Sequence, residues 1–404
     1  MSNNNTIVYI GDFDFRNENV QSHLVKNNAR ILTSIGYDVR YIGIDKTNTD
    51  FNSLDTVKPD NNGYLELPNT LNVAGWFKRK TVCKKIIAQL EEIDREKKIS
   101  HIITYQSPTY AVVLKTIAVW CKNNRVAYIV NCADLPVFDS QPLVRRVVMK
   151  WNWRTIHQIN KQRADGIIAV SRYIEAFYSK RGQKSIVVPP LFDENAYQWN
   201  VTTRNGVVSF IYAGTPFINL NKRVNPKGMK DRLDKIVDLF LALTEKGIAF
   251  AFQIVGITKE EYTVAVPRHK KVLETNDQIR FLGRLSHIQT LELVSNADYS
   301  INFRDLNEMT KAGFSTKIVE SISVGTPIIS NDVGDVSLYL EEGVSWIRLT
   351  GDNQKDCKQL ADLTFLSAEE RTKNKAVTKQ KRVFSIDRYI QTMKTFLLDT
   401  VKTD

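Results

Sequence analysis

The stretch AGFSTKIVESISVGTPIIS, residues 312–330, carries the strongest fold signal in this chain. A Gly-Phe turn precedes an expected helix that contains one acid, Glu320, and ends at Gly325 before a short apolar strand. The unpaired N–H groups and the dipole of a helix N-terminus attract phosphate. We therefore expect Ser315 and Thr316 to cap these donors or bind phosphate oxygens, and Glu320 to accept hydrogen bonds from a ribose diol.

Short apolar, β-branched runs alternate with amphipathic helical stretches along the chain, which predicts parallel α/β layers. A length of 404 residues favours two domains, each with a doubly wound sheet. The expected strands are residues 6–10, 39–44, 101–105, 126–131, 166–170, 186–188, 207–212, 250–255, 279–282, 299–303 and 327–330. The predicted parts are a first domain (1–193), a polar linker (194–206), a second domain (207–377) and a C-terminal helix (378–404).

The 312–330 pattern resembles the donor-binding segment of the retaining GT-B glycosyltransferases of family four, the glycosyl transferases group 1. Members usually carry two glutamates at a fixed spacing, and here Ala312 stands where the first would be. The chain is close to a sub-pattern Ala-Gly-Phe-Pro-Thr-Lys, with Ser315 in the place of Pro. The resemblance implies a GT-B fold of two Rossmann-like domains facing a cleft, and a C-terminal helix that crosses back to the first domain. It implies donor contacts from Gly313, Phe314, Ser315, Thr316, Lys317 and Glu320.

Two further segments of the second domain fit the same family. A glycine turn and a basic loop ending at Lys230 follow strand 207–212. In the resembling family this segment contacts the donor diphosphate, so the resemblance implies that Thr215 and Lys230 bind the donor. Thr215 replaces the usual arginine, and Arg223 or Lys227 could supply its charge; a solvated basic loop is the alternative. Residues 279–284 resemble the family's base-binding strand and turn, which adds Arg284 to the expected donor contacts.

The first domain offers weaker signals. Gly11 follows the first strand, where a glycine lets the backbone approach a ligand, so it joins the expected donor contacts. Asp12 and Asp14 resemble a metal-binding pair of another glycosyltransferase fold, but a solvated loop is favoured and no metal is expected. Asp134 follows strand 126–131, and it is expected either to position an acceptor hydroxyl or to cap a turn.

Composition limits the class of protein. Hydrophobic residues make up 43% and charged residues 25% of the chain, as in globular proteins, and no segment is apolar enough to span a bilayer. The N-terminus does not have the pattern of a signal peptide, and the four cysteines form no C-x-x-C pair, so a reduced, cytoplasmic protein is expected. The net charge of +12 indicates an anionic partner without saying which.

Two basic segments of the first domain suggest an anionic membrane surface. In residues 143–154 the apolar side chains and Trp151 follow helical spacing on one face, while Arg146, Lys150 and Arg154 lie on another. The segment from Trp76 through Lys78 and Arg79 is similar. An apolar stripe that faces the core, with a solvated basic back, is the alternative.

The implied function is transfer of a sugar, with retention, from a nucleotide diphosphate sugar (a UDP-sugar is favoured) to a hydroxyl. The acceptor would be a glycan or a polyprenyl-diphosphate-linked glycan at the inner face of the cell membrane, in envelope or capsular polysaccharide synthesis. Lys230, Asp134 and Glu320 are the expected catalytic residues, with no metal and no cofactor besides the donor. A GT-B sugar-nucleotide epimerase, a basic nucleic-acid-binding protein and a catalytically inactive scaffold remain alternatives, although the chain shows no nucleic-acid-binding motif.

Overall fold

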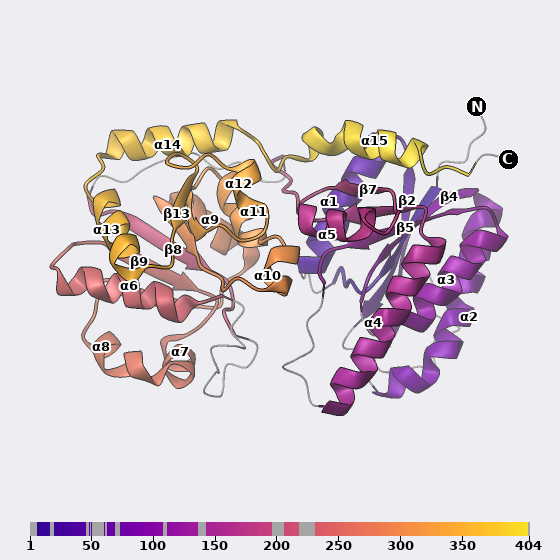
Figure 1. Cartoon of the computed structure of the whole chain (residues 1–404), viewed down its shortest axis with the longest axis horizontal. Coiled ribbons are helices and arrows are strands. Elements are labelled where there is room, and N and C mark those ends of the chain that lie inside the picture. The colour runs from indigo at the N-terminus through magenta and orange to yellow at the C-terminus, as the bar shows by residue number, and fades with distance from the viewer. Residues whose placement is uncertain are drawn as a thin grey trace. The chain divides into compact units, whose positions relative to one another are not determined.

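The protein is described by a computed structural model (Figure 1). It describes residues 6–16, 20–45, 48, 50, 60, 63–68, 73–107, 111–135, 143–195, 206–217 and 231–402, with the side chains of residues 45 and 73–76 excepted. The chain divides into two compact units. The first consists of Met1–Leu191 and Ile386–Asp404, and the second of Phe192–Ser385.

The first unit is built on a seven-stranded sheet in which every neighbouring pair is parallel, in the order β3-β2-β1-β4-β5-β6-β7. Its strands are β1 (Thr6–Gly11), β2 (Asp38–Asp45), β3 (Tyr64–Pro68), β4 (Ile99–Tyr105), β5 (Ala127–Cys132), β6 (Gly166–Ala169) and β7 (Ser185–Val187). Its helices are α1 (Val20–Ser34), α2 (Val73–Glu96), α3 (Ala111–Asn123), α4 (Leu143–Arg163), α5 (Arg172–Ser179), the 3₁₀ helix Ile386–Tyr389 and α15 (Ile390–Leu398).

The second unit is built on a six-stranded parallel sheet in the order β10-β9-β8-β11-β12-β13. Its strands are β8 (Ser209–Ala213), β9 (Ala251–Val255), β10 (Ile279–Gly283), β11 (Tyr299–Asn302), β12 (Ile328–Asn331) and β13 (Trp346–Leu349). Its helices are α6 (Leu233–Glu245), α7 (Lys259–Ala265), the 3₁₀ helix Pro267–His269, α8 (Lys270–Glu274), α9 (His287–Asn296), α10 (Glu308–Ala312), α11 (Thr316–Ser323), α12 (Val336–Tyr339), α13 (Asn353–Leu363) and α14 (Ala368–Gln380).

Both sheets carry helices on both faces, as Figure 1 shows, which confirms the predicted class of two doubly wound parallel sheets. Side chains alternate across β8: Phe210 and Tyr212 pack with α6, while Ile211 packs on the other face with Ile318 of α11. The carboxyl ends of all strands in a parallel sheet meet at one edge, so loops far apart in sequence gather there.

The sequence pattern missed two strands, β3 and β13. Both lie at an edge of their sheet and both are short, with the sequences YLELP and WIRL. A proline and charged residues interrupt their apolar pattern, which edge strands tolerate because only one side of the strand is paired.

The expected helix 378–404 is not continuous. α14 ends at Gln380, and Arg382 adopts a positive φ of 44° before the chain enters the first unit at Ile386. There α15 packs on α1, and the imidazole Nε2 of His101 lies 3.2 Å from the carbonyl of Leu397. Most of the expected linker 194–206 lies outside the described residues.

Candidate functional site

The carboxyl edge of the second sheet gathers a cluster of charged side chains around Asp231. This carboxylate, which precedes α6, is fully buried. It accepts hydrogen bonds from Lys317 Nζ at 2.7 Å, Arg304 Nε at 2.7 Å and the Tyr212 hydroxyl at 2.8 Å. Tyr212 comes from β8, Arg304 from the end of β11 and Lys317 from the first turn of α11. We call these four residues the Asp231 cluster.

The Asp231 cluster is electrostatically asymmetric. Burial by itself would raise the pKa of Asp231, but the charges of Lys317 and Arg304 outweigh burial and hold this pKa well below its ordinary value. Burial, and then the negative charge of Asp231, raise the pKa of Tyr212 well above its ordinary value, so Tyr212 stays neutral. Two cations and one carboxylate leave the cluster with one net positive charge, which suits an anionic ligand.

Gly214 leaves the space that the Lys317 side chain occupies. This glycine follows β8 with a φ of 140°, and a Cβ added to it would overlap the Cε of Lys317. The lysine side chain therefore lies across the glycine backbone, and this side chain stays 17% exposed while its ammonium bonds the buried Asp231. A larger residue at position 214 would push the ammonium out of this position.

The backbone at Arg304 is fixed by Asn331, at the end of the neighbouring strand β12. The Asn331 Nδ2 donates to the Arg304 carbonyl at 2.7 Å, and the Arg304 N–H donates to Asn331 Oδ1 at 3.1 Å. The guanidinium is nearly buried, so its charge is held in one place beside Asp231.

The N-terminus of α11 differs in detail from the prediction. The helix begins at Thr316, with Ser315 at the N-cap position, but the Ser315 hydroxyl makes no capping hydrogen bond. Instead it accepts from Asn302 Nδ2 at 3.3 Å, because Ser315 is buried against the end of β11. In the described part of the chain, the buried Asn302 Oδ1 has no hydrogen-bond partner. The first N–H groups of α11 thus have no capping side chain and can bind a ligand.

Glu320 lies one turn into α11 and is partly exposed. Its Oε1 is 3.2 Å from Nε2 of His287, the first residue of α9. An exposed contact of this kind contributes little to stability, so the Glu320 carboxylate is free to exchange it for ligand hydroxyls.

The side chain of Phe314 does not face this polar edge. It is buried, edge-on to the rings of Tyr339 and Phe384 at 5.5 Å each. A large apolar ring gains most from such packing, so only the Phe314 backbone can serve a donor. Gly313 caps the C-terminus of α10 with an ordinary φ of −82°.

The remaining predicted donor contacts of the second unit are spread along the same edge. Thr215 is exposed directly after Gly214. Arg284 follows β10 and is exposed, with its guanidinium 2.6 Å from Glu261 Oε1. Lys230, Arg223 and Lys227 lie outside the described residues, so the predicted role of Lys230 stays a prediction.

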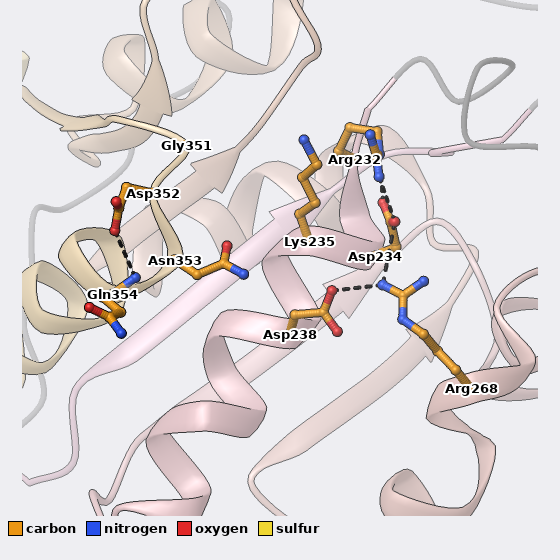
Figure 2. Close-up of a pocket in the computed structure, with 9 residues that line it drawn as sticks. All are labelled: Arg232, Asp234, Lys235, Asp238, Arg268, Gly351, Asp352, Asn353 and Gln354. Carbon is orange, nitrogen blue, oxygen red and sulfur yellow. Dashed lines mark hydrogen bonds and ion pairs between the residues drawn. The ribbon is translucent and has the colours of Figure 1, made fainter.

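A polar cavity of about 610 Å³ lies beside the Asp231 cluster (Figure 2). Side chains at the start of α6 and the turn before α13 line it, together with Arg268. Its charges neutralise one another: Arg232 bonds Asp234 at 2.9 Å, and Arg268 bonds Asp238 at 2.7 Å. The cavity therefore lacks the surplus charge of the Asp231 cluster.

The carboxyl edge of the first sheet forms a second, weaker candidate. A Cβ on Gly11 would collide with the carbonyl of Tyr105, so this glycine is required by the neighbouring strand. Burial first, and then the charges of Asp134 and Asp12, raise the pKa of Tyr105 well above its ordinary value. Asp134 is exposed after β5, and its expected role, positioning an acceptor or capping a turn, stays a prediction.

Asp14 is buried, and its carboxylate accepts a hydrogen bond from the Arg16 N–H at 3.0 Å. Among the described residues, no group of three or more His, Cys, Asp or Glu side chains could hold a metal ion. In the same part of the chain, no helix has the length and apolar character needed to cross a membrane.

Sequence reasoning missed Asp231, Arg304, Tyr212, Asn302 and His287. Asp231 directly follows Lys230 in the sequence, and Arg304 directly follows an apolar strand. A charged residue at the end of a buried strand was the signal that could have found Arg304, because such a residue reaches the carboxyl edge of the sheet.

Residues 221–384 match the family model described as glycosyl transferases group 1. No curated protein sequence matches the chain. Similar solved structures include a glycosyltransferase from Rickettsia africae, with 14% identity, complete coverage of both chains (100%) and a TM-score of 0.65. HepE from Anabaena, solved with UDP and glucose, has 14% identity over 97% of this chain and 99% of HepE, with a TM-score of 0.64. Sucrose-phosphate synthase from Thermosynechococcus elongatus has 12% identity over 97% of this chain and 98% of its own, with a TM-score of 0.63. The chain therefore has the GT-B fold, and the family match within the second unit supports a glycosyltransferase.

Proposed function

We propose that this protein is a retaining glycosyltransferase that moves a sugar from a nucleotide diphosphate sugar to a hydroxyl group, without a metal ion. The observation that carries the proposal is the surplus positive charge of the Asp231 cluster beside the uncapped N-terminus of α11. Fixed donors and cations at such a place stabilise charge that develops on a leaving diphosphate.

The roles of the side chains follow from this placement. The ammonium of Lys317 and the N–H groups of α11 bind the diphosphate, and Glu320 accepts hydrogen bonds from the ribose diol. The predicted contribution of Lys230 adds a second cation. The bond between the sugar anomeric carbon and the diphosphate oxygen breaks, and the acceptor oxygen bonds the same carbon on the same face. The acceptor proton passes to the departing phosphate oxygen, so the protein supplies charge stabilisation and orientation.

A UDP-sugar is the favoured donor. HepE from Anabaena was solved with UDP and glucose, and the pneumococcal O-GlcNAc transferase GtfA with UDP and GlcNAc. Arg284 and the turn after β10 are the proposed neighbours of the base. Asp134, at the carboxyl edge of the first sheet, is the proposed positioning group for the acceptor, a glycan or polyprenyl-diphosphate-linked glycan of envelope or capsule synthesis.

Calorimetric titration of UDP, GDP, dTDP and their sugars tests the donor site. We expect one base to bind, with affinity reduced at least about tenfold in Glu320→Ala, because a hydrogen bond to a charged group contributes roughly 1.5–3 kcal/mol. Glu292→Ala, which changes an exposed glutamate of α9, is the matched control. Absence of binding to every nucleotide would contradict the proposal.

The anomeric configuration of the transferred sugar, followed by NMR, tests retention. A product whose anomeric configuration is opposite to that of the donor would show that the protein is an inverting glycosyltransferase. Conversion of the donor sugar without any acceptor would instead indicate the epimerase.

A further inference from the structure

The first nine residues of α4 expose an apolar row on a basic helix. Residues 143–151 include no buried side chain, and the buried residues of α4 begin at Asn152. Val144 is 78% exposed and Trp151 is 65% exposed. The complete row, which we call the α4 stripe, consists of Leu143, Val144, Val147, Val148 and Trp151. The alternative in which these side chains face the core is therefore wrong.

Helical spacing shows that the α4 stripe points away from the rest of the unit. Its members recur at i, i+1, i+4, i+5 and i+8 and share one face. The residues that α4 buries, from Asn152 through Ile156 to Asn160, lie on a different face. Contiguous exposed apolar side chains of this kind mark an interaction surface in a globular protein.

The basic residues beside the α4 stripe indicate that its partner carries negative charge. Arg146, Lys150 and Arg154 form a row along one flank, and the whole of α4 contains no acidic residue. Phe77 of α2 is also exposed, with exposed Lys78 and half-buried Arg79 beside it. Apolar side chains flanked by cations match an anionic bilayer interface, where the former enter the acyl boundary and the latter meet the headgroups.

The topology places this surface at a functional edge. α4 follows β5 and α2 follows β3, so both helices start at the carboxyl edge of the first sheet, where Asp134 also lies. In Figure 1 the first turns of α4 form its lower end, beyond the strands. A surface at this position can rest on a membrane while the neighbouring loops meet a lipid-bound molecule.

We propose that the α4 stripe and its basic flank dock the protein on an anionic membrane surface as a peripheral, interfacial element. The apolar row supplies buried area and the three cations supply attraction to anionic headgroups. This docking does not depend on the proposed transferase activity, and the two can fail separately.

Flotation with phosphatidylcholine vesicles, with and without phosphatidylglycerol, tests the proposal on the full chain. We expect binding only to the anionic vesicles, and its loss at about 1 M salt, where the Debye length falls to about 3 Å. A triple variant of the apolar row and a triple variant of the flank should each bind at least about tenfold more weakly. The variant of the apolar row combines Val144→Ser, Val147→Ser and Trp151→Ser. The variant of the flank combines Arg146→Gln, Lys150→Gln and Arg154→Gln.

Two matched triple variants in the second unit remove similar exposed groups elsewhere and should bind like the wild type. The apolar control combines Val264→Ser, Val272→Ser and Phe365→Ser. The basic control combines Lys355→Gln, Lys358→Gln and Lys373→Gln. Circular dichroism and urea unfolding should be the same in all four variants and the wild type, which shows that each variant is folded.

Three results would overturn the proposal. One is no flotation of the wild type with anionic vesicles, and another is unchanged flotation of both α4 variants. The third is a dimer in solution that the apolar variant abolishes while vesicle binding is absent, because the α4 stripe would then cover a second copy of the chain.

Discussion

The ammonium of Lys317 lies 2.7 Å from the carboxylate of Asp231, a residue 86 positions earlier in the chain that is fully buried. Lys317 belongs to the stretch that resembles a donor-binding segment, whereas Asp231 belongs to none of the recognised contacts. The pair shows that a buried carboxylate orients the cation at the N-terminus of α11, and several measurements test what depends on it.

Asp231→Asn should destabilise the second unit strongly. The substitution keeps the shape but leaves Lys317 and Arg304 as uncompensated charges in a nearly buried place, which costs about 3–5 kcal/mol. Urea unfolding should show this loss. Glu341→Gln removes an exposed carboxylate of the same unit that pairs with Lys381 and should cost about 1 kcal/mol or less. The double variant with Lys317→Met should recover part of the loss, and strict additivity would argue against the pair.

Gly214→Ala should weaken donor binding through Lys317. The added Cβ would overlap the lysine side chain, so the ammonium must move. Gly247→Ala is the control, since Gly247 also has a positive φ, 66°, but has nothing near the position of a Cβ. Each variant pays a backbone cost of about 1–3 kcal/mol for its positive φ. Calorimetry should show reduced donor affinity in Gly214→Ala alone, and equal affinity in the two variants would remove Lys317 from the donor site.

Glu320 should be responsible for preference for a ribonucleotide. In the wild type the 2′-deoxy form of the preferred nucleotide should bind about tenfold more weakly, because a charged acceptor loses its hydrogen bond. In Glu320→Ala the two forms should bind equally. His287→Gln, which removes the imidazole that contacts Glu320, should leave the preference within about fivefold of the wild type. A preference that survives in Glu320→Ala would assign the diol to another residue.

His101 should make the first unit sensitive to acid. Burial lowers the pKa of His101 to about 4 from its ordinary value of 6.5. Because the folded state disfavours the protonated ring, stability is complete above about pH 6.5 and falls as the pH drops from there towards 4. The loss is roughly 1.4 kcal/mol per pH unit for this group.

The imidazole of His101 contacts the Leu397 carbonyl, so α15 should loosen first. Hydrogen exchange of α15 between pH 6.5 and pH 4 measures this effect. His101→Gln should show a flatter dependence, whereas His287→Gln in the second unit should behave like the wild type. Burial also lowers the pKa of His157 to about 4, so some acid sensitivity should persist in His101→Gln.

The sequence alone was enough to predict the fold. Alternation of apolar runs with amphipathic helices identified the central strands and both doubly wound sheets, because buried parallel strands are nearly continuous hydrophobic runs. The sequence analysis missed the short strands β3 and β13 because they lie at the edges of their sheets, where a strand tolerates polar residues and has no continuous hydrophobic run. The helix that carries Glu320 was also predicted, since its start, its acid and its terminal glycine are local features.

Only the tertiary structure showed how the site is charged. Asp231, Arg304 and Lys317 come from three separate segments, and no local pattern links residues 73 or 86 positions apart. It also showed that Phe314 packs in the core, that Ser315 bonds Asn302 instead of capping α11, and that the α4 stripe is exposed. A sequence determines which face of an element is apolar, but what covers that face, and which charges meet at a sheet edge, depends on how distant segments pack together.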